Sequence, residues 1–428
     1  MNPMAFFIFE PTSGPMKKNI ILFFTIVFSL FGSASAQNVE YAQRLIDTLA
    51  GPSFDGRGYV NSGDVRASIF IAREFEKMGA MPLKGDSYFH HFSLNVNTFP
   101  GNVEVELLKN NDQDWMLQTG VDFIVDPACP SIHVNGLELV WITEAMLLDN
   151  KQFKKLLKKK TKGNVMVVDT VSTANKLANE RRREFIHNGR SICIIDIQRK
   201  LTWSVSRTQS VKVVLQMLPG VIKDAQQISI HVEAKFVQDY KARNVIALIP
   251  GTEQPDSFIV FTAHYDHLGR MGSEVYIPGA NDNASGTAMM LDMASYFAKH
   301  PPKYSVVFIA FAAEEAGLVG SFFFVQEMEA WLEKDKIRFL LNMDLMGSGE
   351  LGIMAVNGKI FTKEYELLKK INDEGNYLSE VKSRGKAANS DHYFFSEAGV
   401  PCFFVYLMGS FNYYHEVEDS PENLRLQK

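Results

Sequence analysis

The chain has 428 residues, of which 46% are hydrophobic and 22% are charged, and its formal net charge is −5. This length exceeds what one ordinary hydrophobic core supports, so we expect at least two domains of globular composition. The slightly negative charge provides no general attraction to nucleic acid, and we predict no nucleic-acid partner.

The N-terminal region is typical of an exported protein. Met16 begins the stretch MKKNIILFFTIVFSLFGSASAQ, in which two lysines precede an apolar run and a small-residue site that ends at Ala36. We interpret residues 1–36 as a signal peptide, with an upstream extension over 1–15 and cleavage before Gln37. A membrane anchor is the alternative, but the apolar run is shorter than the roughly 20 residues that span a bilayer. We therefore expect a secreted or periplasmic protein with no stable membrane span after cleavage.

Two amphipathic helices are predicted next, over residues 38–50 and 63–79. In the second, apolar side chains recur at helical spacing and Gly79 follows as a stop signal. The segment between the helices, GPSFDGRG, has the composition of a loop. We assign residues 37–100 to the first part of the main domain.

The pattern changes between residues 101 and 238, where short β-rich runs alternate with turns. The runs are NVEVELL, NVMVVDT, SICIIDI, VKVVLQML and ISIHVEAKFV. A lysine-rich helix, KQFKKLLKKKTK, carries Phe153, Leu156 and Leu157 on the side opposite its lysines, so we interpret the lysines as a solvated face. We predict that residues 101–238 form a smaller β-rich domain inserted into the main one.

From Asn244 onward, apolar runs alternate with predicted helices over 283–299, 320–334 and 362–374. Runs that are apolar on both faces, with helices between them, indicate a buried and largely parallel sheet. The predicted fold class is α/β, with a mixed, largely parallel central sheet flanked by helices. Residues 37–100 and 239–428 would build this main domain.

Side chains that bind metals follow the predicted strands and precede one helix. In open α/β sheets, ligands bind outside the carboxyl ends of the strands, so these side chains should meet at one edge. The residues are His264 and Asp266, Asp282, Glu314 and Glu315, Asp344, and His415.

This set of side chains favours zinc, because imidazoles and carboxylates are zinc ligands and no lysine or arginine stands within the motifs. Two histidines and three carboxylates exceed what one tetrahedral ion accepts beside a water. The number fits two ions bridged by one carboxylate. Of the adjacent Glu314 and Glu315, one can face the metal while the other acts as a general base. Asp266 and Asp419 are positioned to accept ring N–H groups from the two histidines.

The motifs AHYDHLG, GANDNASGTAMML, AAEEAGLVGS, NMDLMG and YYHEVEDS resemble those of the co-catalytic zinc metallopeptidases. This family is typified by bacterial leucyl aminopeptidases and aminopeptidase Y, and it also contains glutamate carboxypeptidases and glutaminyl cyclases. The resemblance covers about residues 244–420, and a weaker similarity extends over residues 40–95. It implies a fold of the zinc exopeptidase type. Many members carry an inserted lid-like domain, often of the protease-associated type, where we place 101–238.

Carried over by position, the resemblance implies a role for each residue of the set. His264 and Asp344 would hold one zinc ion, Glu315 and His415 would hold the other, and Asp282 would bridge them. Glu314 would be the catalytic base and general acid, and Asp266 would orient His264. The segment SDHYFF, with Asp391 and His392, resembles a stretch near the substrate pocket, but we assign it no role.

Two features depart from the family pattern. Glu416 stands where the family usually has threonine, directly after the last histidine. The chain stops at Lys428, where members normally continue through a long helix packed on the sheet. We therefore expect either a truncated helix or other segments that cover that face.

The predicted protein is an exported zinc-dependent exopeptidase, an aminopeptidase that removes N-terminal residues from peptides through a water activated by two zinc ions. A carboxypeptidase is one alternative, and it would need a basic pocket for which Arg270 and Arg384 are candidates. A glutaminyl cyclase, with one zinc and without the 281–286 segment, is another. A catalytically silent binding scaffold is the third. The sequence does not indicate the preferred terminal residue, the oligomeric state or the role of the inserted domain.

Overall fold

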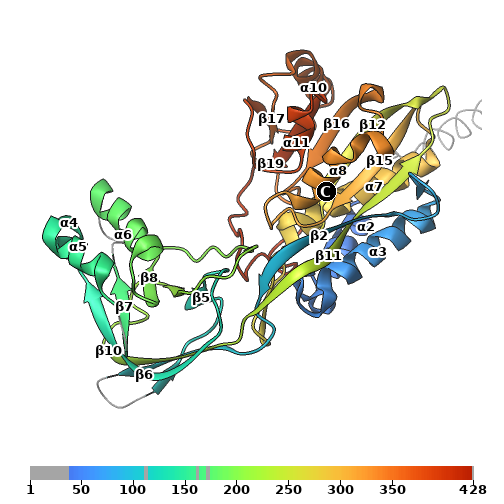
Figure 1. The fold of residues 1–428 in the computed structure, drawn as a ribbon. Coiled ribbons are helices and arrows are strands. Elements are labelled where there is room, and N and C mark those ends of the chain that lie inside the picture. Colours follow the sequence, from blue (N-terminus) through green and yellow to red (C-terminus); the bar gives the residue numbers. More distant parts are fainter. Residues whose placement is uncertain (1–37, 110–113, 161–162, 170–173, 427–428) are drawn as a thin grey trace, which may run out of the picture. The chain divides into compact units, whose positions relative to one another are not determined.

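The computed structural model describes residues 38–109, 114–160, 163–169 and 174–426, and it contains a mixed sheet with helices on both faces, called the central sheet below (Figure 1). Over these residues the sheet has nine strands in the order β1-β11-β15-β12-β16-β19-β17-β18, and β2 pairs with β11. Their bounds are β1 Met81–Pro82, β2 Phe89–Thr98, β11 Lys235–Ile249, β12 Gln254–His264, β15 Tyr304–Phe311, β16 Ile337–Met343, β17 Ile353–Val356, β18 Val381–Arg384 and β19 Cys402–Leu407.

The four strands β15, β12, β16 and β19 are adjacent and parallel, whereas β11 and β17 flank them in antiparallel pairing. This confirms the predicted fold class, a mixed sheet that is parallel in its centre. Because the four central strands run in one direction, their carboxyl ends lie at one edge of the sheet.

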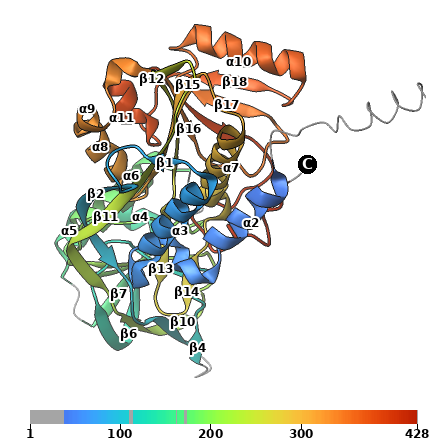
Figure 2. The same ribbon diagram turned by 90° about the vertical axis from the view of Figure 1, so that its right-hand side faces the viewer.

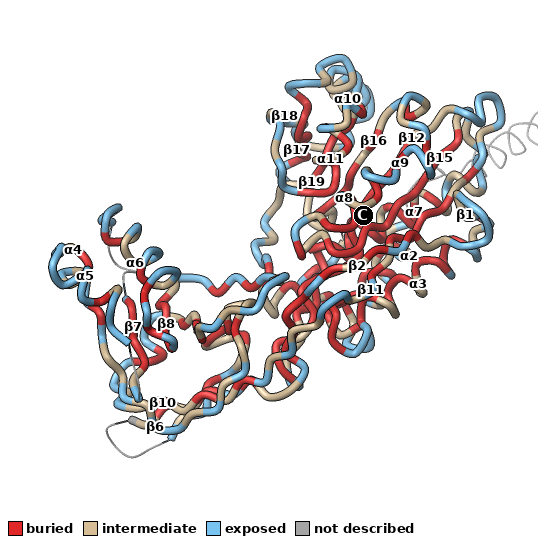
Figure 3. The backbone as a smooth tube through the Cα atoms, in the orientation of Figure 1, coloured by how far each residue is buried: buried red, intermediate tan, exposed pale blue. Residues whose placement is uncertain are grey.

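Helices cover both faces of this sheet because its central strands are apolar on both sides. In β15, Val307, Ile309 and Phe311 pack in one buried cluster, whereas Phe308 and Ala310 pack in another. The second cluster includes residues of α2, α3 and α7, and the first includes residues of α8 and α11 (Figure 2). Buried residues run along β15 and along the C-terminal part of β12, residues 260–264 (Figure 3). The helices are α2 Val39–Leu49, α3 Gly63–Met78, α7 Gly286–Lys299, α8 Val319–Gln326, α9 Met328–Trp331, α10 Thr362–Gly375 and α11 His392–Glu397.

The chain leaves the central sheet after β2 and returns to it through β11. Residues 101–238, the predicted inserted domain, are called the inserted segment below, and their last four residues already belong to β11. Its described part contains an eight-stranded sheet in the order β4-β3-β10-β6-β7-β8-β9-β5. The strands are β3 Val103–Lys109, β4 Asp114–Met116, β5 Phe123–Val125, β6 Ile132–Ile142, β7 Asn164–Val168, β8 Cys193–Ile197, β9 Val213–Met217 and β10 Ala225–Val232. Three helices accompany them, namely α4 Glu144–Leu148, α5 Asn150–Lys158 and α6 Lys176–Asn188.

One buried cluster of the inserted segment includes side chains from outside it. Leu268, Met271 and Ile277 belong to this cluster, and the last two come from a hairpin of β13 (Gly269–Met271) and β14 (Val275–Ile277). Val417, two residues after His415, also packs against the cluster. The inserted segment therefore shares its core with the segments that surround the predicted metal site. The domain bounds themselves stay a prediction.

Several predicted elements differ in extent from those observed. The run ISIHVEAKFV is not one strand, because β10 ends at Val232 and β11 begins at Lys235. The helix predicted over 320–334 is two short helices, because Glu327 leaves helical geometry with φ −106° and ψ 7°. The loop GPSFDGRG contains the short 3-10 helix Pro52–Arg57, and a second one spans Val60–Ser62. A further 3-10 turn, Lys334–Lys336, precedes β16.

The segments near both ends of the chain bear on two other expectations. The predicted signal peptide lies outside the described residues. Within them, no helix combines the length and the apolarity that crossing a bilayer requires. Near the other end, Leu424 is buried in the main core, and Leu426 donates its backbone N–H to Gln43 of α2. Residues after His415 thus cover part of the helical layer.

Candidate metal centre

The edge formed by the four parallel strands carries most of the predicted site. His264 ends β12, Glu314 and Glu315 follow β15, and Asp344 follows β16. His415 lies beyond β19. Asp282 comes from the irregular turn Ala280–Ser285 that leads into α7. The structure brings all six side chains together, and five of them line a cavity of about 240 Å³: His264, Asp282, Glu314, Glu315 and Asp344.

Asp282 lies between the two histidines. Its Oδ1 is 3.4 Å from His264 Nε2, and its Oδ2 is 3.1 Å from His415 Nε2. A second carboxylate lies beside each histidine: Asp344 Oδ2 is 3.4 Å from His264 Nε2, and Glu315 Oε2 is 3.2 Å from His415 Nε2. The arrangement is therefore two histidine–carboxylate pairs that share one central carboxylate.

The donor atoms at this position fit a divalent metal. His415 Nε2 and Asp344 Oδ1 are buried and form no hydrogen bond of acceptable geometry among the described residues, although two carboxylate oxygens lie 3.1 and 3.2 Å from His415 Nε2. Leaving a buried polar atom unpaired costs free energy, so such atoms call for a ligand. Two groups of side chains could each hold a metal ion, because within each group the potential ligand atoms all lie within 4.8 Å of one another. The first group is His264, Glu314 and Asp344, and the second is His264, Asp282 and Glu315. Nitrogen and carboxylate donors at such spacing suit zinc.

Asp266 explains how two adjacent glutamates are held at one site. Its carboxylate accepts the backbone N–H groups of Glu314 (3.1 Å) and Glu315 (3.3 Å). The predicted contact with His264 takes a different form. His264 Nδ1 is 3.2 Å from the backbone oxygen of Asp266 but 3.8 Å from its carboxylate, which is too long for a hydrogen bond. Asp266 thus orients His264 through its main chain.

We expected Asp419 to accept the ring N–H of His415, but this prediction is wrong. Its carboxylate instead accepts the backbone N–H groups of Asn281 (2.7 Å) and Asp282 (3.0 Å). The ring nitrogen Nδ1 of His415 lies 2.8 Å from the backbone oxygen of Trp203, in the inserted segment. The spacing of four residues had suggested the wrong partner, because the loop turns between His415 and Asp419.

His267 is a residue of the site to which the sequence assigned no role. It is buried, and its Nδ1 lies 2.8 Å from Glu315 Oε1. This contact occupies one oxygen of Glu315 and leaves Oε2 beside His415. Its place three residues after His264 was the only available signal.

A hydrogen-bonded chain supports Asp344. Thr262 donates to Asn342 (2.7 Å), which donates to Ser390 Oγ (2.8 Å), and Ser390 in turn donates to Asp344 Oδ2 (3.2 Å). Ser390 begins the SDHYFF segment, so this serine connects that segment to the site.

The two ionisable residues of the same segment, Asp391 and His392, are fully buried. Their side-chain nitrogen and oxygen atoms form no hydrogen bond of standard distance and angle among the described residues, although Ser321 lies near the Asp391 carboxylate. Burial raises the pKa of Asp391 to about 7 and lowers that of His392 to about 4, which favours the neutral form of both side chains.

The charges around the site create a strongly negative potential. Burial lowers the pKa of His415, but Glu315 and Asp282 raise it to a net value of about 11. Burial likewise opposes the charged form of His264, and Asp344 and Glu314 raise its pKa well above the ordinary value. Two histidines that retain protons so strongly indicate a site that attracts cations.

The two adjacent glutamates have opposite electrostatic character. Burial raises the pKa of Glu314 well above its ordinary value, although His264 opposes this shift. Burial also acts to raise the pKa of Glu315, but His415 and His267 hold it well below the ordinary range. Glu315 is therefore suited to bind a cation as a carboxylate, and Glu314 is suited to accept a proton.

Arg57 supports the backbone around the site. Its fully buried guanidinium donates to the carbonyl oxygens of Leu49, Tyr265, Pro278, Gly279 and Asp282, at distances between 2.7 and 3.2 Å. Burial lowers its pKa to about 10, so it remains protonated at neutral pH. It joins the turn that carries Asp282 to the residue after His264.

We expect Arg57→Met to lower the free energy of unfolding by about 3–5 kcal/mol, because it leaves buried carbonyl groups unpaired. Urea denaturation followed by circular dichroism measures this change. Arg73→Met on the exposed side of α3 is the matched control and should change stability by less than about 0.5 kcal/mol. Equal effects of the two substitutions would contradict the role of Arg57.

The comparison with protein families supports, over the C-terminal part of the chain, the resemblance that the motifs indicated. Residues 244–428 match the model described as Peptidase family M28. Aminopeptidase YwaD of Bacillus subtilis is 29% identical over 219 residues, which cover 47% of this chain and 45% of that protein. A probable zinc metalloprotease of Pyrenophora teres f. teres is 39% identical over 107 residues, which cover 24% of this chain and 22% of that protein. The chain thus spans less than half the length of these curated relatives.

The comparison of folds extends over most of the chain. The solved structure of BSAP, a zinc aminopeptidase from Bacillus subtilis, matches with a TM-score of 0.63 and 19% identity, covering 90% of each chain. A Peptidase M28 precursor from Shewanella amazonensis matches with a TM-score of 0.65 and 15% identity, covering 91% of this chain and 89% of that one. At this identity the likeness concerns the fold, and it includes the inserted segment.

Proposed function

We propose that this chain, which carries the M28 peptidase match over residues 244–428, is an exported zinc-dependent aminopeptidase that uses two zinc ions. The observation that carries the proposal is the position of Asp282, with one carboxylate oxygen beside each histidine. His264 and Asp344 would hold one ion, and His415 and Glu315 would hold the other. A shared carboxylate of this kind is what a pair of zinc ions in hydrolytic enzymes needs.

When bound, zinc would supply a Lewis acid that polarises the scissile carbonyl group and lowers the pKa of the attacking water. Glu314 accepts the proton of that water and returns it to the leaving amine. The backbone contacts from Asp266 hold Glu314 in place. Tyr414 lines the cavity and stacks on His415, with ring centroids 3.9 Å apart and an interplanar angle of 15°, so it restricts the orientation of the imidazole.

Removal of zinc tests the proposal. Dialysis against a chelator should abolish the hydrolysis of aminoacyl-anilides, and added zinc should restore it. Elemental analysis of the freshly purified protein should give two zinc ions per chain. One ion per chain, together with cyclisation of N-terminal glutamine, would favour a glutaminyl cyclase. Protein that is purified without zinc and stays inactive after zinc is added would favour a silent scaffold.

A carboxypeptidase is the second candidate, and Arg384 is the observation that favours it. Arg384 ends β18 and lines the same cavity as the metal-binding residues, and no ion pair is found for it among the described residues. The other candidate, Arg270, is held by Asp55 at 2.6 Å and lines a different cavity. A free guanidinium beside the metal site can bind a substrate carboxylate.

Substitution of Arg384 distinguishes the two candidates. If Arg384 binds the terminal carboxylate, Arg384→Met should lower kcat/KM about 10- to 100-fold for peptides with a free C-terminus. The same peptides with an amidated C-terminus should be unaffected. For an aminopeptidase, we expect no difference between free and amidated peptides, and cleavage should release the N-terminal residue. Mass spectrometry of the products identifies which end is removed.

Export is the remaining part of the proposal, and it rests on the composition of residues 16–36. Expression of the full chain in a Gram-negative host should place the protein in the periplasmic or medium fraction. N-terminal sequencing should begin at Gln37. A cytoplasmic protein with an intact N-terminus would contradict export without affecting the zinc site.

A further inference from the structure

We propose that the inserted segment positions the metal ligand His415, and thereby sets the zinc affinity of the position formed by His415, Glu315 and Asp282. The contact is made by residues 200–206, called the strap below, which follow β8. This inference deepens the proposed function and rests on it. It assigns to the inserted segment a role in metal binding.

The strap holds both the side chain and the main chain of His415. His415 Nδ1 lies 2.8 Å from the backbone oxygen of Trp203, and the backbone N–H of Trp203 donates to the backbone oxygen of His415 (3.0 Å). The first contact requires the proton of the neutral ring to be on Nδ1, which leaves Nε2 free to bind metal. The backbone of His415 has φ 58°, a left-handed conformation that persists only where the surrounding structure enforces it.

The two residues after His415 also contact the inserted segment. Glu416 Oε1 lies 2.8 Å from Lys200 Nζ, which also donates to the backbone oxygen of Asn412 (3.1 Å). Val417 packs against a buried cluster of the inserted segment. It lies so close to Gly120 that a Cβ there would approach its Cγ1 to 2.9 Å. Three consecutive residues of the metal-binding loop are thus anchored on the inserted segment. They include Glu416, which departs from the family's threonine.

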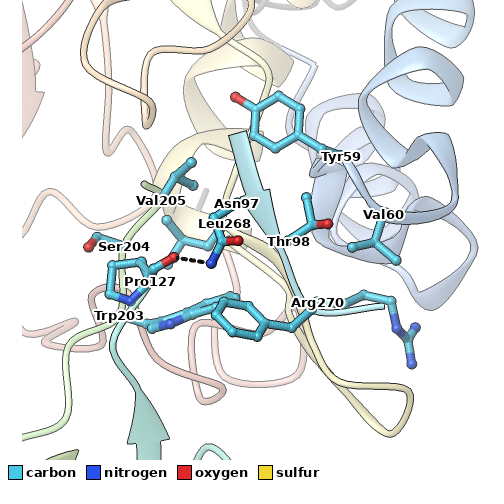
Figure 4. Close-up of a pocket in the computed structure, with 11 residues that line it drawn as sticks. Tyr59, Val60, Asn97, Thr98, Pro127, Trp203, Ser204, Val205, Leu268 and Arg270 are labelled. Atoms are coloured by element: carbon cyan, nitrogen blue, oxygen red, sulfur yellow. Dashed lines mark hydrogen bonds between the residues drawn. The ribbon is translucent and has the colours of Figure 1, made fainter. Parts of the chain in front are cut away.

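The strap is itself firmly held. Trp203 is buried, and its Nε1 donates to the backbone oxygen of Val125 (2.9 Å). Asn97 donates its backbone N–H to Ser206 (2.8 Å) and its side-chain amide to Pro127 (2.9 Å). Figure 4 shows Trp203, Ser204 and Val205 gathered with Asn97 and Pro127.

Little free space remains around the strap. The cavity that these residues line, together with Tyr59 and Leu268, has a volume of about 10 Å³, which is at most the space of one water. Because the backbone carbonyl group of Trp203 is fixed in this way, its hydrogen bond with His415 Nδ1 holds the imidazole ring in one orientation. Outer partners of metal-binding histidines tune affinity because they fix the tautomer and direction of the ring. The pair of His264 and Asp344 has no contact of this kind with the inserted segment among the described residues, so the strap should affect only one of the two metal positions.

The test measures zinc affinity instead of activity. Trp203→Ala removes the side chain that anchors the strap, and it should weaken zinc binding at one position about 10- to 100-fold, as measured by competition with a chromophoric chelator. Trp141→Ala is the matched control, since Trp141 lies in the same segment but is 42% exposed on β6, and it should leave both constants unchanged. Lys200→Met, at a side chain that is 48% exposed, removes the link to Glu416 without affecting the core. It should weaken the same position by a smaller factor.

A double-substitution cycle shows whether the strap acts through His415. In a His415→Ala background the affected position is already lost, so adding Trp203→Ala should not change the remaining zinc constant. The proposal is overturned if Trp203→Ala and Lys200→Met, both with native circular dichroism, bind zinc as the unchanged protein does. It is also overturned if Trp203→Ala weakens zinc binding in the His415→Ala background. If the unchanged protein binds no zinc at all, the proposed function fails together with this inference, whereas the first two results leave the proposed function intact.

Discussion

Glu314→Gln is expected to retain zinc and to lower kcat about 10²- to 10⁴-fold, the range that a positioned general base contributes. Glutamine has nearly the same size and keeps the contacts of the backbone, so the site should stay assembled. It cannot accept a proton from the attacking water. The measurement is kcat for an aminoacyl-anilide, together with zinc content by elemental analysis.

Glu76→Gln is the matched control, because Glu76 is exposed on α3, far along the chain from the strand ends that carry the site. It should retain full activity. A Glu314→Gln enzyme with full activity would refute the assignment of the base. A variant that loses zinc together with turnover would make Glu314 a ligand, which its position within 4.8 Å of His264 and Asp344 allows geometrically.

Asp282→Asn is expected to remove zinc from both positions and to abolish activity. Each oxygen of Asp282 lies beside a different histidine, so the loss of one oxygen and of the negative charge affects both positions. We expect the zinc dissociation constants of both positions to rise by more than about 100-fold, which exceeds the loss of affinity expected when an outer partner of a ligand is substituted. Competition with a chelator measures both constants.

Two other substitutions calibrate this result. Asp344→Asn should weaken only the position of His264, and Asp419→Asn should have the smaller effect of a residue that holds the Asp282 backbone. If Asp282→Asn weakened only one position, Asp282 would be a terminal ligand, and the two-zinc proposal would lose its main support.

The predicted placement of these residues depends on one geometric rule. The carboxyl ends of adjacent parallel strands meet at one edge of a sheet, so a histidine or carboxylate directly after an apolar run can be assigned to that edge without coordinates. His264, Glu315 and Asp344 could be placed in this way. The alternation of apolar runs and helices was sufficient to predict a mixed sheet with a parallel centre, which the structure confirms.

The elements that were missed lack a strong pattern. Helix α6, Lys176–Asn188, is charged on most of its surface and buries only Ala178 and Phe185, so its apolar periodicity is weak. The helix predicted over 320–334 breaks at Glu327, whose carboxylate lies 3.3 Å from His90 Nε2 of β2. No feature of the local sequence reveals a partner 237 residues away.

The sequence by itself determined the types of the side chains, their positions at the strand ends and the family of peptidases that they resemble. Only the tertiary structure decided which groups hold them. Asp419 binds the Asp282 backbone, Arg57 binds five carbonyl groups, and the strap binds His415 across 212 residues. The physical reason is that many of these contacts use main-chain N–H and C=O groups. Every residue type carries a C=O group and all but proline carry an N–H group, so no pattern of residue types reports where such contacts form until the chain is folded.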